Sequence, residues 1–306
     1  MKVRIGLTMS GMKFDSAADV WTWVDACEAS RVDSLWQSDR LIGREPHIEA
    51  MSLMAALAGR TRRLKFGMSV VAISFRDPLV LAKECATIDF LSGGRFLPAF
   101  GLGAPQLPEW KAVGRSPKSS ARQADEALEL LTRLWSEEDV SFAGEHYHYE
   151  RVTISPKPVQ KQLPLWIGGN SAAAIRRTAR FGTGWIGGIQ TADEVAPVVE
   201  GIKREAERLG RWIDPDHYGA SFSYRFGTRS DPIVDRAVKS LQAFRPGLDA
   251  QKYFIVGGAQ EILQQVQDYV RMGVTKFVLR PMAADMADLM EQTRRLAEEV
   301  IPIAHN

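Results

Sequence analysis

Two kinds of hydrophobic pattern alternate along this chain. Short, nearly continuous apolar runs, typical of buried strands, are followed by longer segments in which apolar residues recur every third or fourth position, typical of amphipathic helices. Strands are predicted at residues 3–8, 33–38, 65–71, 96–101, 164–169, 184–187, 218–226 and 276–279. A regular order of strand and helix of this kind favours a parallel sheet covered by helices.

Capping residues mark the ends of several predicted helices. Ser16 is an expected N-cap, Asp77 is another because Pro78 follows it in the first turn, and Gly93 is an expected helix stop. Ser120 with Gln123 three residues later predicts a capping box. The remaining helices are predicted at about 48–59, 171–181, 193–209, 260–272 and 286–300.

The strand count and the chain length predict an α/β fold, a single (β/α)8 TIM barrel spanning residues 1–306. Two segments interrupt the regular order: a β-hairpin at about 138–155, turning at Ala143 and Gly144, and a segment at about 228–256 that shows no clear pattern. A doubly wound open sheet is the alternative. Its dinucleotide-binding form requires a Gly-x-Gly-x-x-Gly turn after an early strand, and the nearest candidate, starting at Gly101, lacks the third glycine.

The charge pattern excludes several classes of partner. Lys and Arg number 39 and Asp and Glu number 37, giving a net charge of +2, and the two signs are interleaved along the chain. No basic stripe is present for nucleic acid or for a membrane surface. No apolar stretch is long enough for a membrane span, and the first residues do not resemble a signal peptide, so a cytoplasmic location is expected.

Cysteine and histidine offer little support for a metal site. Cys27 and Cys85 fall within apolar helical patterns, where neither a disulfide nor a metal ligand is expected. His146 and His148 alternate in the predicted hairpin and would share one face of a strand, but no third ligand stands near them. The other histidines are isolated. We therefore predict no metal.

The most informative local segment leads from the fifth predicted strand into a helix. Gly168 and Gly169 allow a ligand to approach the backbone, and Asn170 or Ser171 can cap the helix that follows. Free N–H groups and the positive end of a helix dipole form an anion site, for which a phosphate is the natural guest. The alternative is a tight turn whose glycines serve packing alone.

Three charged residues follow other predicted strands, where barrel enzymes place their active sites. Asp39 and Arg40 form either a salt bridge that ties their loop or a functional pair, in which Asp39 accepts a hydrogen bond from a ring N–H and Arg40 stabilises an anionic ring. Glu109 is either an acid or base or, more commonly for such a residue, a solvated loop glutamate. No protein nucleophile stands in a recognisable motif, which favours chemistry supplied by a bound cofactor.

Several of these segments together resemble the bacterial luciferase-like, flavin-dependent monooxygenase and oxidoreductase family. The first block runs from Leu64 to Val71, continues through residues 76–95 and ends at the glycines of residues 100–103. Further matching blocks follow in the expected order at residues 114–135, 142–147, 156–169, 184–186 and 273–281. The resemblance covers nearly the whole chain.

The resemblance implies a TIM barrel that binds FMN or the 8-hydroxy-5-deazaflavin coenzyme, usually as a homodimer. In family members a bulge at the end of the third strand contacts the flavin ring, and this bulge often contains a non-prolyl cis peptide. The corresponding position in this chain is Ser69 and Val70. The family's phosphate site falls on residues 168–171. The implied cofactor-binding residues are Asp39, Ser69, Val70, Gly101, Gly168, Gly169, Asn170 and Ser171, and the candidate catalytic residues are Arg40 and Asp39.

The chain also departs from the family pattern. Deazaflavin enzymes often carry Asp-His where this chain has Asp39 and Arg40, so that a permanent cation replaces the histidine thought to act as acid or base. Ala104 and Leu107 stand where some members place acidic and amide residues. The chain therefore keeps the residues that the resemblance assigns to cofactor binding, but it lacks these proton-transfer groups.

The resulting hypothesis is an FMN-dependent monooxygenase acting on a small-molecule substrate, with a flavin reductase as a possible supplier of reduced flavin. The alternative is an oxidoreductase that transfers a hydride with the deazaflavin coenzyme. A second alternative, motivated by the missing acid–base residues, is a non-catalytic flavin-binding barrel.

Overall fold

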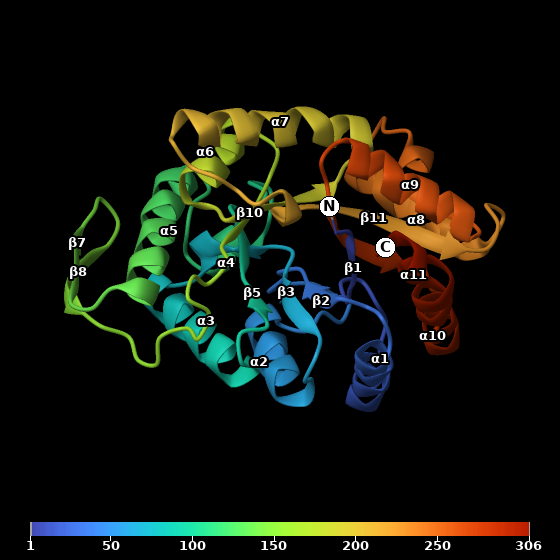
Figure 1. The fold of residues 1–306 in the computed structure, drawn as a ribbon, viewed down its shortest axis with the longest axis horizontal. Coiled ribbons are helices and arrows are strands. Elements are labelled where there is room, and N and C mark those ends of the chain that lie inside the picture. Colours follow the sequence, from blue (N-terminus) through green and yellow to red (C-terminus); the bar gives the residue numbers. More distant parts are fainter. Residues whose placement is uncertain (1, 306) are drawn as a thin grey trace.

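The computed structural model describes residues 2–305, and its centre is a parallel sheet curled into a ring (Figure 1). The ring consists of β1 (Arg4–Thr8), β2 (Ser34–Gln37), β3 (Lys65–Met68) with β4 (Val71–Ala72), β5 (Phe96–Leu97) with β6 (Ala99–Gly101), β9 (Trp166–Gly168), β10 (Gly184–Ile189), β11 (Tyr218–Phe226) and β13 (Lys276–Pro281).

The ring is closed by pairs that connect its first and last strands. β13 pairs with both β11 and β1, and β1 continues the sheet through β2 to β3. β3 and β4 are two halves of the third strand, and they pair with β5 and β6, the two halves of the fourth. β6 then leads through β9 and β10 back to β11. This topology confirms the predicted TIM barrel.

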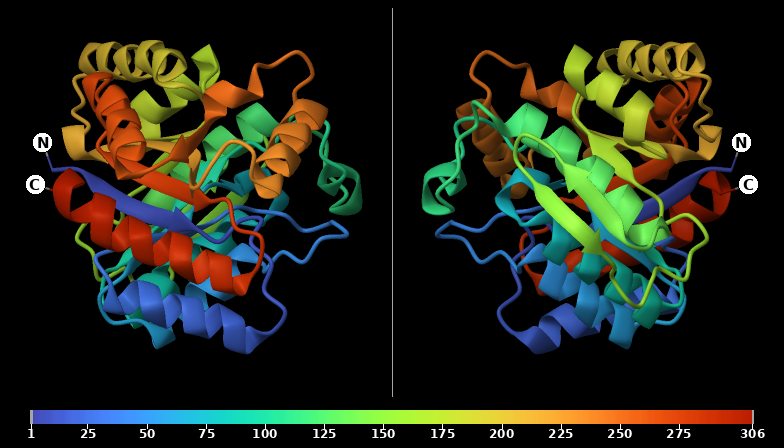
Figure 2. Two further views of the ribbon diagram at one scale, coloured as in Figure 1. Left: turned by 90° about the vertical axis from the view of Figure 1, so that its right-hand side faces the viewer. Right: turned by 90° about the vertical axis from the view of Figure 1, so that its left-hand side faces the viewer.

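Helices cover the outside of the ring (Figure 2). The main helices are α1 (Ala17–Ala29), α2 (Ala50–Arg60), α3 (Pro78–Ser92), α5 (Ser120–Ser136), α6 (Ala172–Phe181), α7 (Ala192–Arg208), α9 (Ala259–Arg271) and α10 (Met286–Arg295). Shorter or additional elements are α4 (Glu109–Ala112), α8 (Pro232–Phe244), α11 (Ile301–Ala304) and the 3-10 turn Ile73–Phe75. None of the helices in residues 2–305 has the length and apolar character needed to cross a membrane.

The predicted helix caps are confirmed with one exception. The Ser16 side chain accepts a hydrogen bond from the Asp19 N–H, the Asp77 side chain caps α3, and Gly93 ends α3 in the left-handed conformation. The capping box at Ser120 is wrong. Ser120 is already the first residue of α5, and its hydroxyl donates to the carbonyl oxygen of Pro117 at 2.7 Å, so it does not cap the helix.

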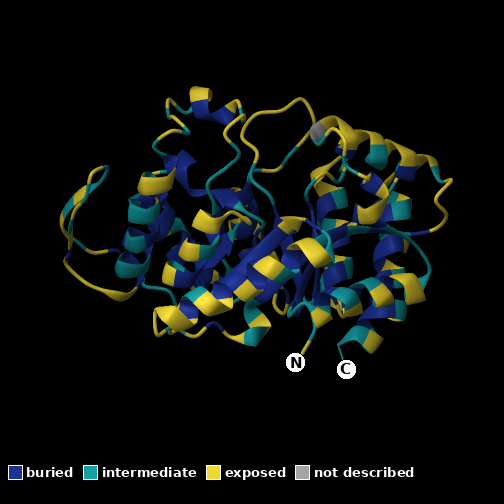
Figure 3. Cartoon of the chain, turned by 90° about the horizontal axis from the view of Figure 1, so that it is seen from above, coloured by how far each residue is buried: buried dark blue, intermediate teal, exposed yellow. Residues whose placement is uncertain are grey.

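Alternate residues of the strands face two different cores. Leu35, Ile167 and Phe277 point outward and pack under the helices, within the large apolar cluster. Their neighbours along the strands point into the ring and form a smaller cluster of Trp36, Ala99, Trp166, Ile186 and Val278. Figure 3 shows the strands as the buried centre of the molecule, with exposed residues on loops and outer helix faces. The inner cluster fills the barrel below its carboxyl end.

The two interrupting segments differ in how they join the barrel. The hairpin β7 (Val140–Ala143) and β8 (His148–Val152) stands beyond α5 at the edge of the molecule (Figures 1 and 2). His146 lies in its turn while His148 begins β8, so the expectation that the two histidines share a strand face is wrong. The second segment contains α8 and leads into β12 (Phe254–Gly257), which pairs with β11 outside the ring.

Candidate functional site

The carboxyl ends of the strands surround a floor built from Val70 and glycines. The peptide bond between Ser69 and Val70 is cis, at the position that the family resemblance indicates. A Cβ added to Gly101 would lie 2.7 Å from Cγ2 of Val70, and one added to Gly168 would lie 2.9 Å from its Cγ1. Any larger residue at either position would clash with the side chain of Val70. Val70, Gly101 and Gly168 together therefore form a smooth apolar surface.

Asp39 is tied to the third strand and not to its neighbour Arg40. Its Oδ2 accepts hydrogen bonds from the Ala72 N–H at 3.0 Å and from Arg76 Nη1 at 2.6 Å, and its Oδ1 accepts from Arg76 Nη2 at 2.9 Å. The carboxylate side chain is only 4% exposed. Asp39 therefore forms a salt bridge, but the predicted pairing with Arg40 is wrong and its partner is Arg76.

Arg76 binds two carboxylates at once. Its Nη2 also donates to Oε1 of Glu49 at 2.8 Å. Burial by itself would lower the pKa of Arg76, but the hydrogen bonds and charges of Asp39 and Glu49 outweigh it and raise the pKa above its ordinary value. The same contacts help to lower the pKa of Glu49, against the opposing effect of burial. The ion pairs connect the end of β2, the start of α2 and the bulge at Val70.

Arg40 lies exposed in the loop between β2 and α2, and it forms no ion pair or side-chain hydrogen bond with any residue in the range 2–305. In the same loop, Nε2 of His47 lies 2.9 Å from the carbonyl oxygen of Ser38. The structure thus leaves Arg40 free to face a ligand or solvent, and it places a histidine beside the end of β2 that the sequence analysis did not connect with the site.

Glu109 is buried, so the expectation of a solvated loop glutamate is wrong. The residue is 3% exposed, and its Oε1 accepts a weak hydrogen bond from the Ile42 N–H at 3.4 Å. Its Oε2 has no partner within the described residues. The side chain is enclosed because Trp110 packs into a small apolar cluster with Ala72 and Phe75, which holds α4 against the third strand.

The segment from Gly168 to Ser171 forms the expected turn at the start of α6. Gly169 has a φ of +111°, which favours glycine, and its carbonyl oxygen accepts a hydrogen bond from the Trp185 indole N–H at 2.8 Å. The Ser171 hydroxyl accepts from the Ala174 N–H at 3.2 Å. The N–H groups of Ala172 and Ala173 have no acceptor among residues 2–305, so the helix presents two free donors at the barrel mouth.

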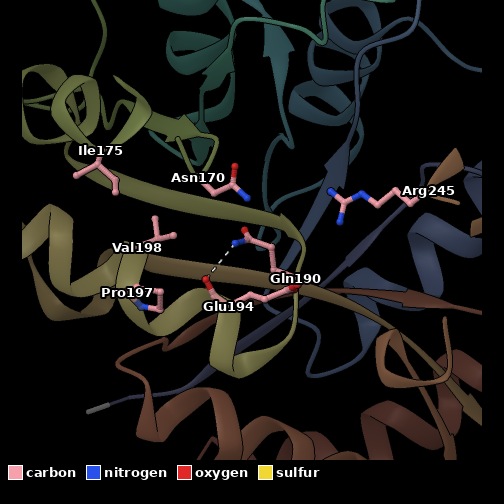
Figure 4. A pocket seen from close by; sticks show the side chains of 7 residues that line it. All are labelled: Asn170, Ile175, Gln190, Glu194, Pro197, Val198 and Arg245. Atoms are coloured by element: carbon pink, nitrogen blue, oxygen red, sulfur yellow. Dashed lines mark hydrogen bonds between the residues drawn. The ribbon is translucent and has the colours of Figure 1, made fainter. Parts of the chain in front are cut away.

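A cavity of about 310 Å³ adjoins this turn (Figure 4). Asn170 lies on one side, and Arg245, from the segment after α8, lies on the other. The guanidinium of Arg245 donates to the carbonyl oxygen of Ile189 at 3.1 Å. The lining residues are Asn170, Ile175, Gln190, Glu194, Pro197, Val198 and Arg245. The segment at 228–256 therefore contributes a cation beside the candidate anion site.

No group of three or more His, Cys, Asp or Glu side chains in the described part of the chain is arranged to hold a metal ion. Cys27 and Cys85 are both buried and free, and burial raises the pKa of each thiol. The polar groups at the barrel mouth include backbone N–H groups, arginines, carboxylates and side-chain amides. This set can bind an anionic cofactor and a small molecule beside it.

Comparison with known proteins identifies the class. The model of the luciferase-like monooxygenase family matches residues 3–251, and the chain belongs to this family. This membership agrees with the family resemblance seen in the sequence. The chain is 32% identical over 168 residues to an uncharacterised protein of Mycobacterium tuberculosis and spans 57% of the length of that relative.

Other similar proteins match over nearly their whole length. An F420-dependent glucose-6-phosphate dehydrogenase of Amycolatopsis mediterranei is 26% identical, with 98% of each chain covered. An F420-dependent secondary alcohol dehydrogenase superimposes with a TM-score of 0.86 at 17% identity, with 100% of each chain covered. A type II Baeyer-Villiger monooxygenase from Pseudomonas putida in complex with FMN gives a TM-score of 0.80 at 17% identity, with 98% of each chain covered. Both structural likenesses concern the fold.

Proposed function

We propose that this protein is an oxidoreductase that transfers a hydride between a small organic substrate and the deazaflavin cofactor F420. The observation that supports it most is the full-length similarity to F420-dependent glucose-6-phosphate dehydrogenase, which covers 98% of both chains. The proposal reverses the ranking reached from the sequence, where FMN-dependent oxygenation came first. The chemistry of the cofactor would supply the hydride acceptor or donor, and the protein would bind, orient and exclude water.

The residues at the barrel mouth fit such a cofactor. The free N–H groups of Ala172 and Ala173, with Gly168, Gly169, Asn170 and Ser171 around them, would hold its phosphate. The floor formed by Val70, Gly101 and Gly168 suits a flat ring, because the two glycines add no side chain beside Val70. Ser69 shares the cis peptide bond with Val70, so its main chain belongs to the same floor.

Asp39 has a positioning role in this proposal. Both of its oxygens already accept hydrogen bonds from Arg76 or Ala72, and these contacts fix the bulge at Val70. A carboxylate oxygen can accept more than one bond, so Oδ1 retains the capacity to accept from a ring N–H. Arg40, which has no carboxylate partner in residues 2–305, would place its charge where an anionic reduced ring needs stabilising.

An FMN-dependent monooxygenase is the second candidate, and Arg40 is the residue that favours it. An arginine is protonated at any physiological pH, so it cannot exchange a proton with an alcohol as a histidine at this position would. A flavin reductase would then be the partner that supplies reduced FMN. A non-catalytic flavin-binding barrel remains the proposal only if neither cofactor supports turnover.

We also propose that the protein forms a homodimer. Val80, Phe90 and Leu91 of α3 are large apolar side chains that are 53–60% exposed, which is unusual for a helix face that contacts only water. Light scattering of the purified protein tests this proposal.

The function is tested by turnover with defined cofactors. Purified protein, oxidised F420 and a panel of secondary alcohols and sugar phosphates are mixed without oxygen, and loss of the cofactor's visible absorbance is followed. Reduction of F420 by at least one compound supports hydride transfer. Oxygen uptake with reduced FMN and a substrate, combined with no reduction of F420 by any compound, would support the second candidate instead.

A further inference from the structure

Arg280 is a long cationic side chain that the sheet register points into the barrel mouth. Along β13, Phe277 and Leu279 belong to the outer core, whereas Val278 belongs to the cluster inside the ring. Arg280 lies two residues after Val278 and therefore shares its inward face. It lies opposite Ser223 of β11 and one layer closer to the mouth than the inner cluster.

The guanidinium of Arg280 has almost no partner in the protein. The one hydrogen bond recorded for it within residues 2–305 is a long one, from Nη2 to the carbonyl oxygen of Gly11 at 3.5 Å. No described carboxylate lies within ion-pair distance. Two partly buried arginines differ from it: Arg225 binds Asp231 and Asp288, and Arg95 donates to several carbonyl and hydroxyl oxygens.

The guanidinium of Arg280 is open to a ligand at the barrel mouth. The side chain of Arg280 is exposed at the barrel mouth, and the atoms around it lower its pKa by partial burial. A Cβ at Gly11 would lie 2.2 Å from Nη2, so glycine at this position makes room for the group. One layer below, Oγ of Ser221 faces the same interior without a partner. An exposed guanidinium without a carboxylate partner keeps its N–H donors available for an anion.

We propose that Arg280 binds an anionic group of the substrate, a carboxylate or a phosphate, and that the substrates of this enzyme are organic anions. The proposal rests on the proposed function, because it assigns the substrate class of the same barrel mouth. The planar guanidinium presents parallel N–H donors that match the two oxygens of a carboxylate or phosphate, a geometry that a neutral alcohol does not satisfy. Arg280 thus acts as the specificity-determining residue, on a strand that β10 and β11 separate from the strand leading to the α6 anion site.

Binding of inorganic phosphate to the F420-loaded protein tests the proposal. The bound cofactor fills the α6 site, so that added phosphate reports on a second anion site. The Arg280→Met variant is expected to raise the dissociation constant for phosphate at least tenfold, while the dissociation constant for F420 changes less than twofold and the thermal midpoint does not fall. The Arg44→Met variant removes one charge from the exposed loop after β2 and serves as the matched control, with both constants unchanged.

Three results would overturn the proposal: phosphate affinity unchanged by Arg280→Met, loss of F420 affinity in its place, or a fall in thermal midpoint large enough to show that Arg280 is structural. If wild-type protein fails to bind F420, the proposed function fails, but the same phosphate titration of the Ala172→Glu variant still tests Arg280. In the Ala172→Glu variant the new carboxylate blocks the α6 site, so no cofactor is needed to fill it. If the double variant Ala172→Glu, Arg280→Met no longer binds phosphate, the proposal is supported.

Discussion

Asp39 and Arg76 form a two-point ion pair, with oxygen–nitrogen distances of 2.6 and 2.9 Å, that joins the end of the second strand to the turn after the third. The pair lies beneath the bulge at Val70, and Asp39 holds the same bulge through the Ala72 N–H. An acid at the end of the second strand therefore shapes the floor of the candidate cofactor site through backbone contacts.

Loss of this pair is expected to cost both stability and cofactor affinity. Breaking a buried pair from one side leaves an uncompensated charge, so Arg76→Met should lower the free energy of unfolding by about 3–5 kcal/mol. Asp39→Asn should cost less because an amide oxygen still accepts from Ala72, and the double variant should cost less than the two single changes together. Urea unfolding measures these values. Asp25→Asn, which breaks the exposed pair with Arg60, is the control and should cost at most about 1 kcal/mol. Equal costs at the two pairs would show that Asp39 and Arg76 have no special role.

Added bulk beside Val70 is expected to disturb the floor. In Gly168→Ala the new methyl group would lie 2.9 Å from Cγ1 and 3.2 Å from Cγ2 of Val70, whose β-branched side chain has little freedom to move. Such overpacking costs about 1–3 kcal/mol, and it should weaken F420 binding at least tenfold. The double variant with Val70→Ala removes both methyl groups and should recover most of the stability. Wild-type affinity in Gly168→Ala would contradict the assigned floor.

A carboxylate placed at the start of α6 should compete with the cofactor for the anion site. Ala172 is exposed in the first turn of α6, where a negative charge stabilises a helix by about 0.3–1 kcal/mol. Ala172→Glu is therefore expected to keep or raise the thermal midpoint while increasing the dissociation constant for the cofactor more than tenfold. Ala172→Gln has nearly the same size without the charge and should bind almost normally. If both variants bind equally, the site does not recognise a phosphate.

The closure of the barrel near its amino end should depend on pH through His305. The Ile5 N–H donates to Nε2 of His305 at 3.0 Å, which requires that nitrogen to be unprotonated. Burial, together with the positive charges of Arg4 and Lys276, lowers the pKa of His305 from 6.5, against the opposing effect of Asp33. The unfolded chain then takes up the proton first, so the free energy of unfolding should fall as the pH drops below about 6.5.

The measurement for His305 is urea unfolding at about pH 7.5 and about pH 5.5. Wild-type protein should lose more stability between the two values than His305→Ala, which lacks the titrating ring. An identical loss in both proteins would assign the pH dependence to other groups.

The regular part of the fold could be predicted from the sequence because its signals are local. The strand positions follow from apolar runs, and Ser16, Asp77 and Gly93 cap helices through contacts within a few residues of themselves. The segment around α8 could not be predicted, since its apolar residues pack on a small separate cluster with Tyr253 and Phe254 and not on the main core. β12 joins β11 outside the ring, which no repeating pattern indicates.

The site could be located from the sequence, but its contacts could not. The glycines at 168 and 169 stand in a recognisable turn segment, and the position of the cis peptide follows from the family resemblance. Arg76 reaches Asp39 only because of the way the third strand bends. The sequence shows neighbours along the chain and not this bend, so Arg40 is the predicted partner of Asp39. The burial of Glu109 depends on Trp110 packing under a distant strand. Arg280 stands at the end of a predicted strand, but only the register shows that it points inward without a counter-charge.

The identity of the cofactor is best tested by titrating the purified protein with F420 and, separately, with FMN. Quenching of cofactor fluorescence gives both dissociation constants in one buffer, and Ala172→Glu shows whether binding uses the α6 site. We expect micromolar or tighter binding of F420, at least tenfold stronger than that of FMN, and loss of that binding in the variant. Tight binding of FMN with none of F420 would contradict this expectation.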